Sequence, residues 1–376
     1  MIRVALVIAG PYPAFRGSQV LVSHLALGLR QRGHDVHVVS YGARRGERPG
    51  PRMARLVLDA VLVARLWKVV RRARIEVLHA HNYEAAIASL LVGRATGRPV
   101  LYHGHSAHAD ELPLYVAQPG ARRWMERLGS LLDREVPRRA DFCVTVSHAL
   151  ATSLRRAGVA EDAVAALEPA LAPGELEPVA SADGEDGLVC YAGNLDAYQR
   201  LDFLLESFAR VRAGNPTARL RLVSHPDARD HAARLAARGL GPGVDVVLAR
   251  SYVAARDELR RAAVVVSPRA ECSGFPMKLL TYRALGKAIV ACAGSAKGLV
   301  DGVTARVVAD GDSAGFAGAV ASLLHDPPAR RRLGEAARRA VADGAAWEVG
   351  LDRLEAIYRR VLARTRPVLL PVTATE

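Results

Sequence analysis

Apolar runs and helical stripes alternate along the whole chain. Short continuous apolar runs such as "IRVALVIA" at 2–9 are typical of buried parallel strands. Between them lie amphipathic stretches that predict helices. In the first of these, at 18–33, Ser18 is placed to cap the helix, Leu21 and Leu25 lie on one stripe, and Gly33 ends it. The alternation predicts βαβ units, in which helices cover a parallel sheet.

The alternation occurs twice. A stretch at 168–187, rich in Pro, Gly, Ala and acidic residues and without a period, separates the two halves and predicts a domain boundary. We therefore expect an α/β protein with two Rossmann-like, doubly wound parallel-sheet domains at 1–172 and 187–345. A helix at 346–366 is expected to pack back on the N-terminal domain. Open α/β sheets bind ligands at the carboxyl ends of their strands, so the predicted site is a central cleft that both domains face. The predicted strands after the first lie at 35–41, 75–82, 99–104, 140–147, 188–193, 219–224, 244–249, 263–268, 287–291 and 305–310.

Positive charge is concentrated in one part of the N-terminal half. The formal net charge of the 376 residues is +14, and between Arg44 and Arg74 ten Lys or Arg stand against two acids. The predicted helix at 54–74 is apolar on one side, basic on the other, and carries Trp67. One interpretation of this pattern is that the helix binds an anionic membrane surface. The alternative is a core-packing helix with a solvated basic face. Nucleic acid is not an expected partner, because there is no recognition motif and aromatic residues do not alternate with the basic ones.

Cysteine usage and hydropathy indicate the compartment. The four cysteines are scattered and form no C-x-x-C pair, which is typical of core residues in a reducing environment. No run of about 18 apolar residues occurs that could span a bilayer. The sequence therefore predicts a cytoplasmic protein, peripheral on the inner face of the membrane if the basic helix binds lipid.

The stretch "SGFPMKLLTYRALGKAIVA" at 273–291 carries the clearest candidate chemistry. A turn that enters a helix offers free backbone N–H groups and the positive end of the helix dipole, which together bind phosphate. Gly274 permits close backbone approach, Pro276 suits the first helical position, and Lys278 adds a cation. A diphosphate is the predicted ligand, and an ordinary helix start is the alternative.

The order and spacing of several stretches resemble a retaining, nucleotide-sugar-dependent glycosyltransferase of family four, with the GT-B fold of two Rossmann-like domains. The resemblance implies transfer of a hexosyl group from a nucleoside diphosphate sugar to a carbohydrate or lipid-linked acceptor, in polysaccharide or glycolipid synthesis. The donor is then a co-substrate, and no metal or other cofactor is expected, because backbone amides with Arg and Lys can stabilise a leaving diphosphate. The matching stretches are "GPYPAFRGSQVLVSHLALGLRQRGHDVHVVSYG", "LHAHNYEAA", "LYHGHSAHADELP", "ADFCVTVSHALATSL", "YAGNLDAYQRLDFLLESFARVR", "SPRAECSGFPMKLLTYRALGKAIVA" and "GLVDGVTARVVADGD".

The resemblance also implies roles for individual residues. It makes the N-terminal domain the acceptor-binding domain and the C-terminal domain the nucleotide-sugar-binding one. His105 is expected beside the transferred sugar as a catalytic residue, since an imidazole can hydrogen-bond sugar hydroxyls and leaving-group oxygens. His79 and His81 are weaker candidates, and the alternative for both is a satisfied polar residue at a strand end. The implied diphosphate ligands are Gly17, Arg200, Gly274, Phe275, Pro276 and Lys278, and the implied sugar or acceptor contacts are Arg16, His81, His103 and Ser273.

The chain departs from the family at a pair of glutamates eight residues apart. Ser273 and Thr281 occupy those positions, and we expect Glu271 to replace the first glutamate as a catalytic residue. Thr281 is expected to hydrogen-bond the nucleotide ribose without the charge that strengthens such bonds. Asn194 likewise stands where family members have Arg. These departures leave open a catalytically degenerate homologue that acts as a binding or scaffold protein. A nucleotide-sugar epimerase of the same fold is a separate alternative.

Overall fold

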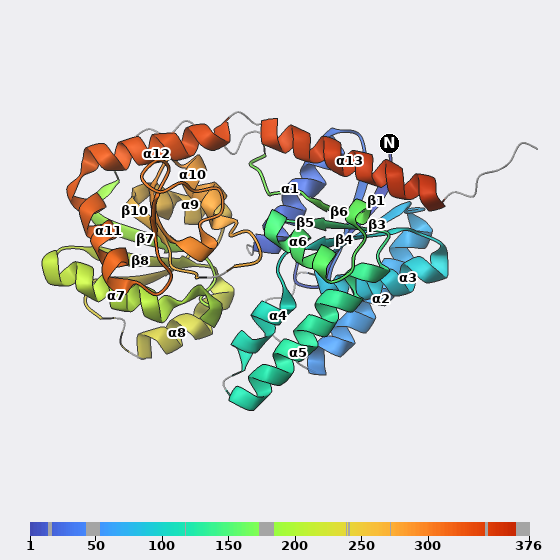
Figure 1. Cartoon of the computed structure of the whole chain (residues 1–376), viewed down its shortest axis with the longest axis horizontal. Helices are drawn as coiled ribbons and strands as arrows, with labels where there is room; N and C mark the ends of the chain where they lie inside the picture. The colour runs from blue at the N-terminus through green and yellow to red at the C-terminus, as the bar shows by residue number, and fades with distance from the viewer. Residues whose placement is uncertain are drawn as a thin grey trace, which may run out of the picture.

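The computed structural model describes residues 1–13, 17–42, 53–116, 118–172, 184–237, 239, 241–270, 272–342 and 345–365. Figure 1 shows two lobes, each built around a sheet with helices on both faces. The predicted α/β architecture of two doubly wound domains is confirmed. The four cysteines are buried and unpaired, as their scattered positions predicted.

The N-terminal domain has a parallel six-stranded sheet in the order β2-β1-β3-β4-β5-β6. Alternate residues of β1 face opposite sides of this sheet. Ala5 and Val7 pack with α2 and α3, whereas Leu6 and Ile8 pack with α1 and the C-terminal helix. Buried on both faces, the strands are the continuous apolar runs that the sequence showed. The strands are β1 (Arg3–Ile8), β2 (Asp35–Val39), β3 (Val77–His81), β4 (Val100–Gly104), β5 (Phe142–Thr145) and β6 (Val164–Ala166). The helices are α1 (Gly17–Gln31), α2 (Met53–Arg72), α3 (Tyr83–Thr96), α4 (His108–Glu111), α5 (Pro119–Glu135) and α6 (His148–Arg156).

The C-terminal domain has a second parallel six-stranded sheet, in the order β12-β11-β10-β7-β8-β9. Its first strand begins at Glu185, two residues before the predicted domain start. One face packs with α7 and α11, and the other with α9 and α10. The strands are β7 (Glu185–Ala192), β8 (Arg219–Ser224), β9 (Val244–Leu248), β10 (Ala262–Ser267), β11 (Ala288–Cys292) and β12 (Arg306–Val308). The helices are α7 (Leu201–Gly214), α8 (Arg229–Ala237), α9 (Tyr252–Arg261), α10 (Lys278–Ala284), α11 (Ser313–His325), α12 (Pro327–Ala342) and α13 (Ala345–Thr365).

The last helix returns to the first domain. Figure 1 shows α12 along the C-terminal lobe and α13 crossing to the N-terminal one. Trp347, Leu351 and Tyr358 of α13 are buried in the core that includes α1 and β1. A β-carbon on Gly28 of α1 would lie 2.6 Å from the Trp347 ring, so glycine is required for this close approach. Among the described helices, none is both long enough and apolar enough to cross a bilayer.

Candidate functional site

The two domains are joined by polar contacts around the turn that precedes α10. Ser273 accepts a hydrogen bond from the backbone N–H of Ala107 through its side chain (2.8 Å) and another from the Ser147 hydroxyl through its carbonyl (2.7 Å). Nearby, Arg269 of the C-terminal domain pairs with Glu111 of the N-terminal domain at 3.2 Å. These bonds hold the carboxyl edges of the two sheets against each other.

One cavity, here named the C-terminal cavity, opens at the carboxyl ends of β7, β8, β9 and β10. This is where open α/β sheets present their binding crevice. Gly17 and His24 of α1 close it from the N-terminal domain. Its wall combines apolar, aromatic and cationic groups, which suits a ligand that has a flat ring and a charged portion. The C-terminal domain contributes Asn194, Tyr198, Gln199, Ser224, Tyr252, Arg256, Arg269, Phe275, Pro276, Met277, Lys278 and Thr281, among others.

Lys278 and Arg269 supply positive charge to the C-terminal cavity. The Lys278 ammonium donates to Gln199 Oε1 at 2.8 Å and lies 4.0 Å from the centre of the Tyr191 ring. Gly193 makes room for it, because a β-carbon there would lie 3.0 Å from Nζ. Burial, and secondarily the charge of Arg269, lowers the pKa of Lys278 well below its usual value. An anion in the cavity would offset the cost of this buried charge.

Thr281 meets Tyr252 on another wall of the same cavity. The two hydroxyl groups are 2.9 Å apart, and either can be the donor. This neutral pair stands where family members were expected to have a carboxylate. It provides hydrogen-bonding groups for a ligand hydroxyl, without a charge.

A second cavity, here named the N-terminal cavity, adjoins the first. It is lined by Gly10 and Ser18, by residues of α2 and α5, and by His105 and Glu111. Gly17, Asn194, Tyr198, Arg269, Phe275 and Met277 line both cavities. The two spaces therefore share a wall at the domain cleft, where molecules held in each would meet.

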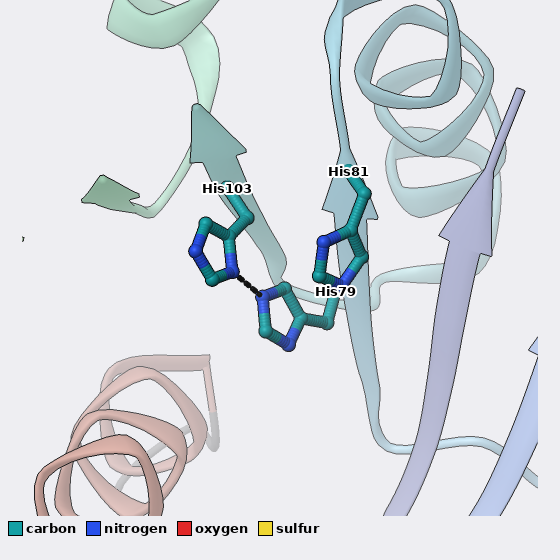
Figure 2. A group of neighbouring side chains, drawn as sticks. All are labelled: His79, His81 and His103. Atoms are coloured by element: carbon teal, nitrogen blue, oxygen red, sulfur yellow. Dashed lines mark hydrogen bonds between the residues drawn. The ribbon is translucent and has the colours of Figure 1, made fainter. Parts of the chain in front are cut away.

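Four histidines occupy the end of the N-terminal sheet that faces the cleft. His79 and His81 of β3 and His103 and His105 on and after β4 point to one face, because they alternate along neighbouring strands whose register aligns His81 with His103. Figure 2 shows three of them gathered between the strands. His79 Nε2 lies 3.0 Å from His103 Nδ1, and His81 Nδ1 lies 3.0 Å from His105 Nε2. His79 Nδ1 also lies 2.6 Å from the Tyr358 hydroxyl of α13.

Burial keeps these imidazoles uncharged. It lowers the pKa of His79 to about 3, with a smaller contribution from His105, and the pKa of His105 to about 4. The pKa values of His81 and His103 are well below the usual one, again because of burial first and neighbouring histidines second. At neutral pH each ring therefore carries one proton and both donates and accepts.

The structure places the predicted residues unequally. Gly17, Phe275, Pro276, Lys278 and Thr281 line the C-terminal cavity, and His105 lines the N-terminal one. The roles predicted for these residues at a ligand stay predictions. Arg16 and Glu271 lie outside the described residues.

Other expectations need correction. His81 and His103, expected at a sugar, are buried behind His105 and line neither cavity, since His81 Nδ1 faces His105 and His103 Nδ1 faces His79. Arg200 is exposed and covers the Phe203 ring at the start of α7, so it does not line either cavity. Pro276 precedes α10 by two residues rather than occupying its first position.

The turn itself differs from the expected phosphate loop. A β-carbon on Gly274 would lie 2.1 Å from the carbonyl oxygen of His105, so this glycine is required for contact between the domains. Ser273 likewise bridges the domains, and neither residue lines the two cavities. Phe275 to Lys278 form the part of the turn that reaches the cavity wall.

Sequence reasoning missed several cavity residues. Arg269 directly follows Ser267-Pro268 at the end of β10, and a cation at the carboxyl end of a parallel strand was the available signal. Tyr252 and Arg256 lie on α9, whose polar sequence resembles a solvated helix and carried no signal.

Two groups of side chains have the composition of metal ligands. His79, His81 and His103 each offer a nitrogen, and these nitrogens lie within 4.8 Å of one another. The triplet Asp310-Gly311-Asp312 is engaged otherwise, since Asp310 accepts from the Gly294 N–H and Asp312 caps α11 through the Gly315 N–H. The carboxylates of the triplet are thus structural.

Two family models match the chain, one in each domain. Residues 15–170 match Glycosyltransferase Family 4, and residues 186–326 match Glycosyl transferases group 1. A D-inositol 3-phosphate glycosyltransferase from Kribbella flavida is 31% identical over 208 residues, which are 50% of this chain and 47% of that protein. The chain therefore spans about half the length of this curated relative.

Solved structures share the whole fold. Sucrose-phosphate synthase from Thermosynechococcus elongatus superposes with a TM-score of 0.77 at 19% identity, over 97% of this chain and 100% of that one. HepE from Anabaena, in complex with UDP and glucose, superposes with a TM-score of 0.72 at 15% identity, over 96% of this chain and 100% of that one. At such identities the likeness establishes the GT-B architecture alone.

Proposed function

Because the chain belongs to the family-four type of GT-B glycosyltransferases, we propose that it transfers a hexosyl group from a nucleoside diphosphate sugar to an acceptor hydroxyl, with retention of anomeric configuration. The observation that carries the proposal is the shared wall of the two cavities. The C-terminal cavity takes the donor, the N-terminal cavity takes the acceptor, and the sugar is transferred where they meet.

The donor is held through its diphosphate and its ribose. Lys278 and Arg269 neutralise the diphosphate, and the Thr281–Tyr252 hydroxyl pair faces the ribose. HepE, which shares this fold, was solved with UDP and glucose. The likeness supports a nucleoside diphosphate as the ligand class.

The chemistry needs stabilisation of a leaving group. The bond between the anomeric carbon and the diphosphate oxygen breaks, and the acceptor oxygen bonds to the same carbon on the same face. The acceptor proton passes to the departing phosphate oxygen. Preorganised cations lower the barrier by stabilising the charge that develops on that oxygen. We propose that Lys278 and Arg269 do this without a resident metal or other cofactor.

The acceptor cavity combines apolar and polar walls. Leu56, Ile87, Met125 and Leu128 line it beside Glu84, Asp59 and His108. A carbohydrate attached to a lipid has matching chemistry, with hydroxyl groups for the polar wall and an alkyl chain for the apolar one. Synthesis of polysaccharide or glycolipid is the corresponding process.

A membrane surface would present such an acceptor. Leu56 (60% exposed) and Trp67 (37% exposed) lie on α2 with exposed Lys68, Arg71 and Arg72. Exposed apolar and basic side chains on the same helix match the interface of an anionic bilayer. We propose peripheral attachment at the cytoplasmic face. Nucleic acid stays excluded as a proposed partner, because no recognition motif accompanies the basic charge.

A binding or scaffold protein without transferase activity is the second candidate. It is favoured by Thr281, since the neutral hydroxyl replaces the carboxylate of active family members. Such a protein would bind nucleotide and release no sugar to any acceptor.

The test is a screen of nucleoside diphosphate sugars by thermal shift, followed by product analysis with lipid-linked and free saccharides. Binding raises the apparent melting temperature by mass action. The proposal predicts stabilisation by at least one donor and a product of retained configuration. Donor binding without a product from any acceptor supports the second candidate. If no nucleotide raises the melting temperature, both candidates are refuted.

A further inference from the structure

The four histidines of β3 and β4 form two hydrogen-bonded pairs, one behind the other. The deeper pair is His79 with His103, and the pair nearer the cleft is His81 with His105. Successive rings also contact each other between the pairs, with ring centres 4.5 Å apart for His79 and His81, and 5.1 Å apart for His103 and His105. The deeper pair, tied to Tyr358, thus limits rotation of the rings in front of it.

The geometry of each pair is that of a hydrogen bond. The ring centres are 5.2 Å apart in both pairs, which is about the 3.0 Å N···N distance plus the two spans from ring centre to nitrogen. The two nitrogens therefore lie nearly on the line between the ring centres. Imidazoles that share a metal instead aim their lone pairs at a common point beside that line. The head-on approach, which Figure 2 shows for His79 and His103, indicates N–H···N bonds.

Burial decides which nitrogen of His81 carries the proton. Its Nδ1 faces His105, and its Nε2 is buried without a partner. If Nε2 were protonated, an N–H donor would be buried with no acceptor, which is rarer in proteins than an unfilled acceptor. The proton therefore lies on Nδ1 and is donated to His105 Nε2. Because a neutral imidazole has only one N–H, His105 then carries its own proton on Nδ1.

We propose that His81 is a positioning residue that holds His105 in the Nδ1–H tautomer, so that His105 presents an N–H donor to the N-terminal cavity. Among the described residues, the structure gives His105 Nδ1 no hydrogen-bond partner. His105 lines the cavity that adjoins the shared wall. The Nδ1–H group of His105 faces an oxygen of the transferred sugar or of the acceptor substrate. This assignment rests on the proposed transferase function. A sugar oxygen at that place is recognised as an acceptor of a hydrogen bond.

The experiment reads the tautomer in the resting protein. Two-bond ¹H–¹⁵N spectra of protein labelled in its histidine rings distinguish Nδ1–H from Nε2–H and from imidazolium. The expected result at pH 7.5 is the Nδ1–H form for both His81 and His105. An Nε2–H form of His105 overturns the proposal. One zinc ion per purified chain, with loss of the His79, His81 and His103 ring signals on loading, also overturns it, because the rings would then be ligands.

Variants separate positioning from folding. In His81→Asn the amide nitrogen stands where Nδ1 stood and still donates, whereas His81→Phe keeps the ring and loses the donor. We expect His81→Phe to mix the His105 tautomers and to lower kcat roughly 10- to 100-fold, as loss of a supporting hydrogen bond typically does, with little change in donor KM. His81→Asn restores the tautomer and most of the turnover, and His325→Asn, an exposed change on α11, alters neither. Equal kcat values for the Phe and Asn variants refute the proposal.

The spectra do not depend on catalysis. An Nδ1–H tautomer in a protein that transfers no sugar supports the pairing and refutes only the proposed function. An Nε2–H tautomer of His105 in an active transferase refutes the pairing and leaves the proposed function supported.

Discussion

The carbonyl oxygen of His105 occupies the space in front of Gly274, 2.1 Å from where a β-carbon on that residue would lie. His105 belongs to the N-terminal domain and Gly274 to the C-terminal one, so the two backbones touch across the cleft. The contact also places His105 beside the turn whose next residues, Phe275 to Lys278, line the C-terminal cavity. His105 of one domain is thereby held next to the cavity wall that the other domain provides.

Gly274→Ala should separate the domains. The added methyl group cannot fit against a backbone oxygen, so the turn or the His105 strand end must move. We expect a loss of about 1–3 kcal/mol in stability and a fall in kcat, measured by chemical denaturation and by transfer assays. Gly318→Ala, on the exposed side of α11, is the control and should stabilise by up to about 1 kcal/mol. Wild-type stability in Gly274→Ala would contradict this close contact.

Nucleoside diphosphate binding should weaken as pH rises. Burial and Arg269 lower the pKa of Lys278 in the empty protein, whereas a bound diphosphate raises it. The complex then holds more protons than the free protein, so the affinity falls as pH rises through the pKa of the free lysine. Calorimetry between pH 7.5 and 9.5, in buffers of different ionisation enthalpy, measures the proton uptake. Lys278→Met should abolish the uptake and lower the affinity about tenfold or more, while Lys68→Met on α2 changes neither.

Thr281→Val should weaken nucleotide binding without affecting pyrophosphate binding. The valine keeps the shape and removes the hydroxyl that pairs with Tyr252. A lost neutral hydrogen bond costs about 0.5–1.5 kcal/mol, a factor of roughly 2 to 12 in affinity. Titration of both ligands into the Val and Ser variants measures the effect, and Thr281→Ser should bind like the wild type. A comparable loss for pyrophosphate would place Thr281 at the phosphates instead.

The protein should lose stability as pH falls from about 6.5 towards 4. Histidines in the unfolded chain bind protons near pH 6.5, whereas burial holds the pKa of His105 at about 4 and that of His79 at about 3 when folded. The unfolded state therefore binds more protons throughout this window, and the free energy of unfolding decreases as pH falls. Each such histidine contributes about 1.4 kcal/mol per pH unit. His79→Gln should remove one such contribution from the slope of urea denaturation against pH, and the exposed change His325→Gln should not.

Reversal of charge on α2 should release the protein from anionic vesicles. Lys68 and Arg72 are exposed, whereas Arg65 also donates to the Ser40 carbonyl and is left unchanged. Each basic residue near an anionic surface contributes about 1 kcal/mol, so Lys68→Glu with Arg72→Glu should lower the partition coefficient by roughly 30-fold or more. Co-sedimentation with phosphatidylserine vesicles measures this. The pair Arg332→Glu and Arg339→Glu on α12 is the control, and equal losses for both pairs would favour a solvated α2 face.

The sequence by itself determined the architecture, because the signals for strands and helices are local. Continuous apolar runs predicted both parallel sheets, and the aperiodic stretch at 168–187 predicted the boundary between them. It also predicted which parts of the chain lie at the cleft, since the carboxyl ends of parallel strands share one edge. Lys278 was named from the turn that enters a helix at 273–278, whereas His105 and Thr281 were named from the resemblance to family-four glycosyltransferases.

Only the tertiary structure decided which side chains face the cavities. Gln199 and Arg200 are neighbours, yet Gln199 reaches Lys278, while Arg200, with a left-handed backbone (φ 56°), turns onto Phe203. Strand alternation placed His81, His103 and His105 on one face, but the depth of each ring depends on α13, whose Tyr358 is 279 residues from His79. The direction of a side chain is set by backbone torsions and by partners distant in sequence, and neither leaves a periodic trace along the chain.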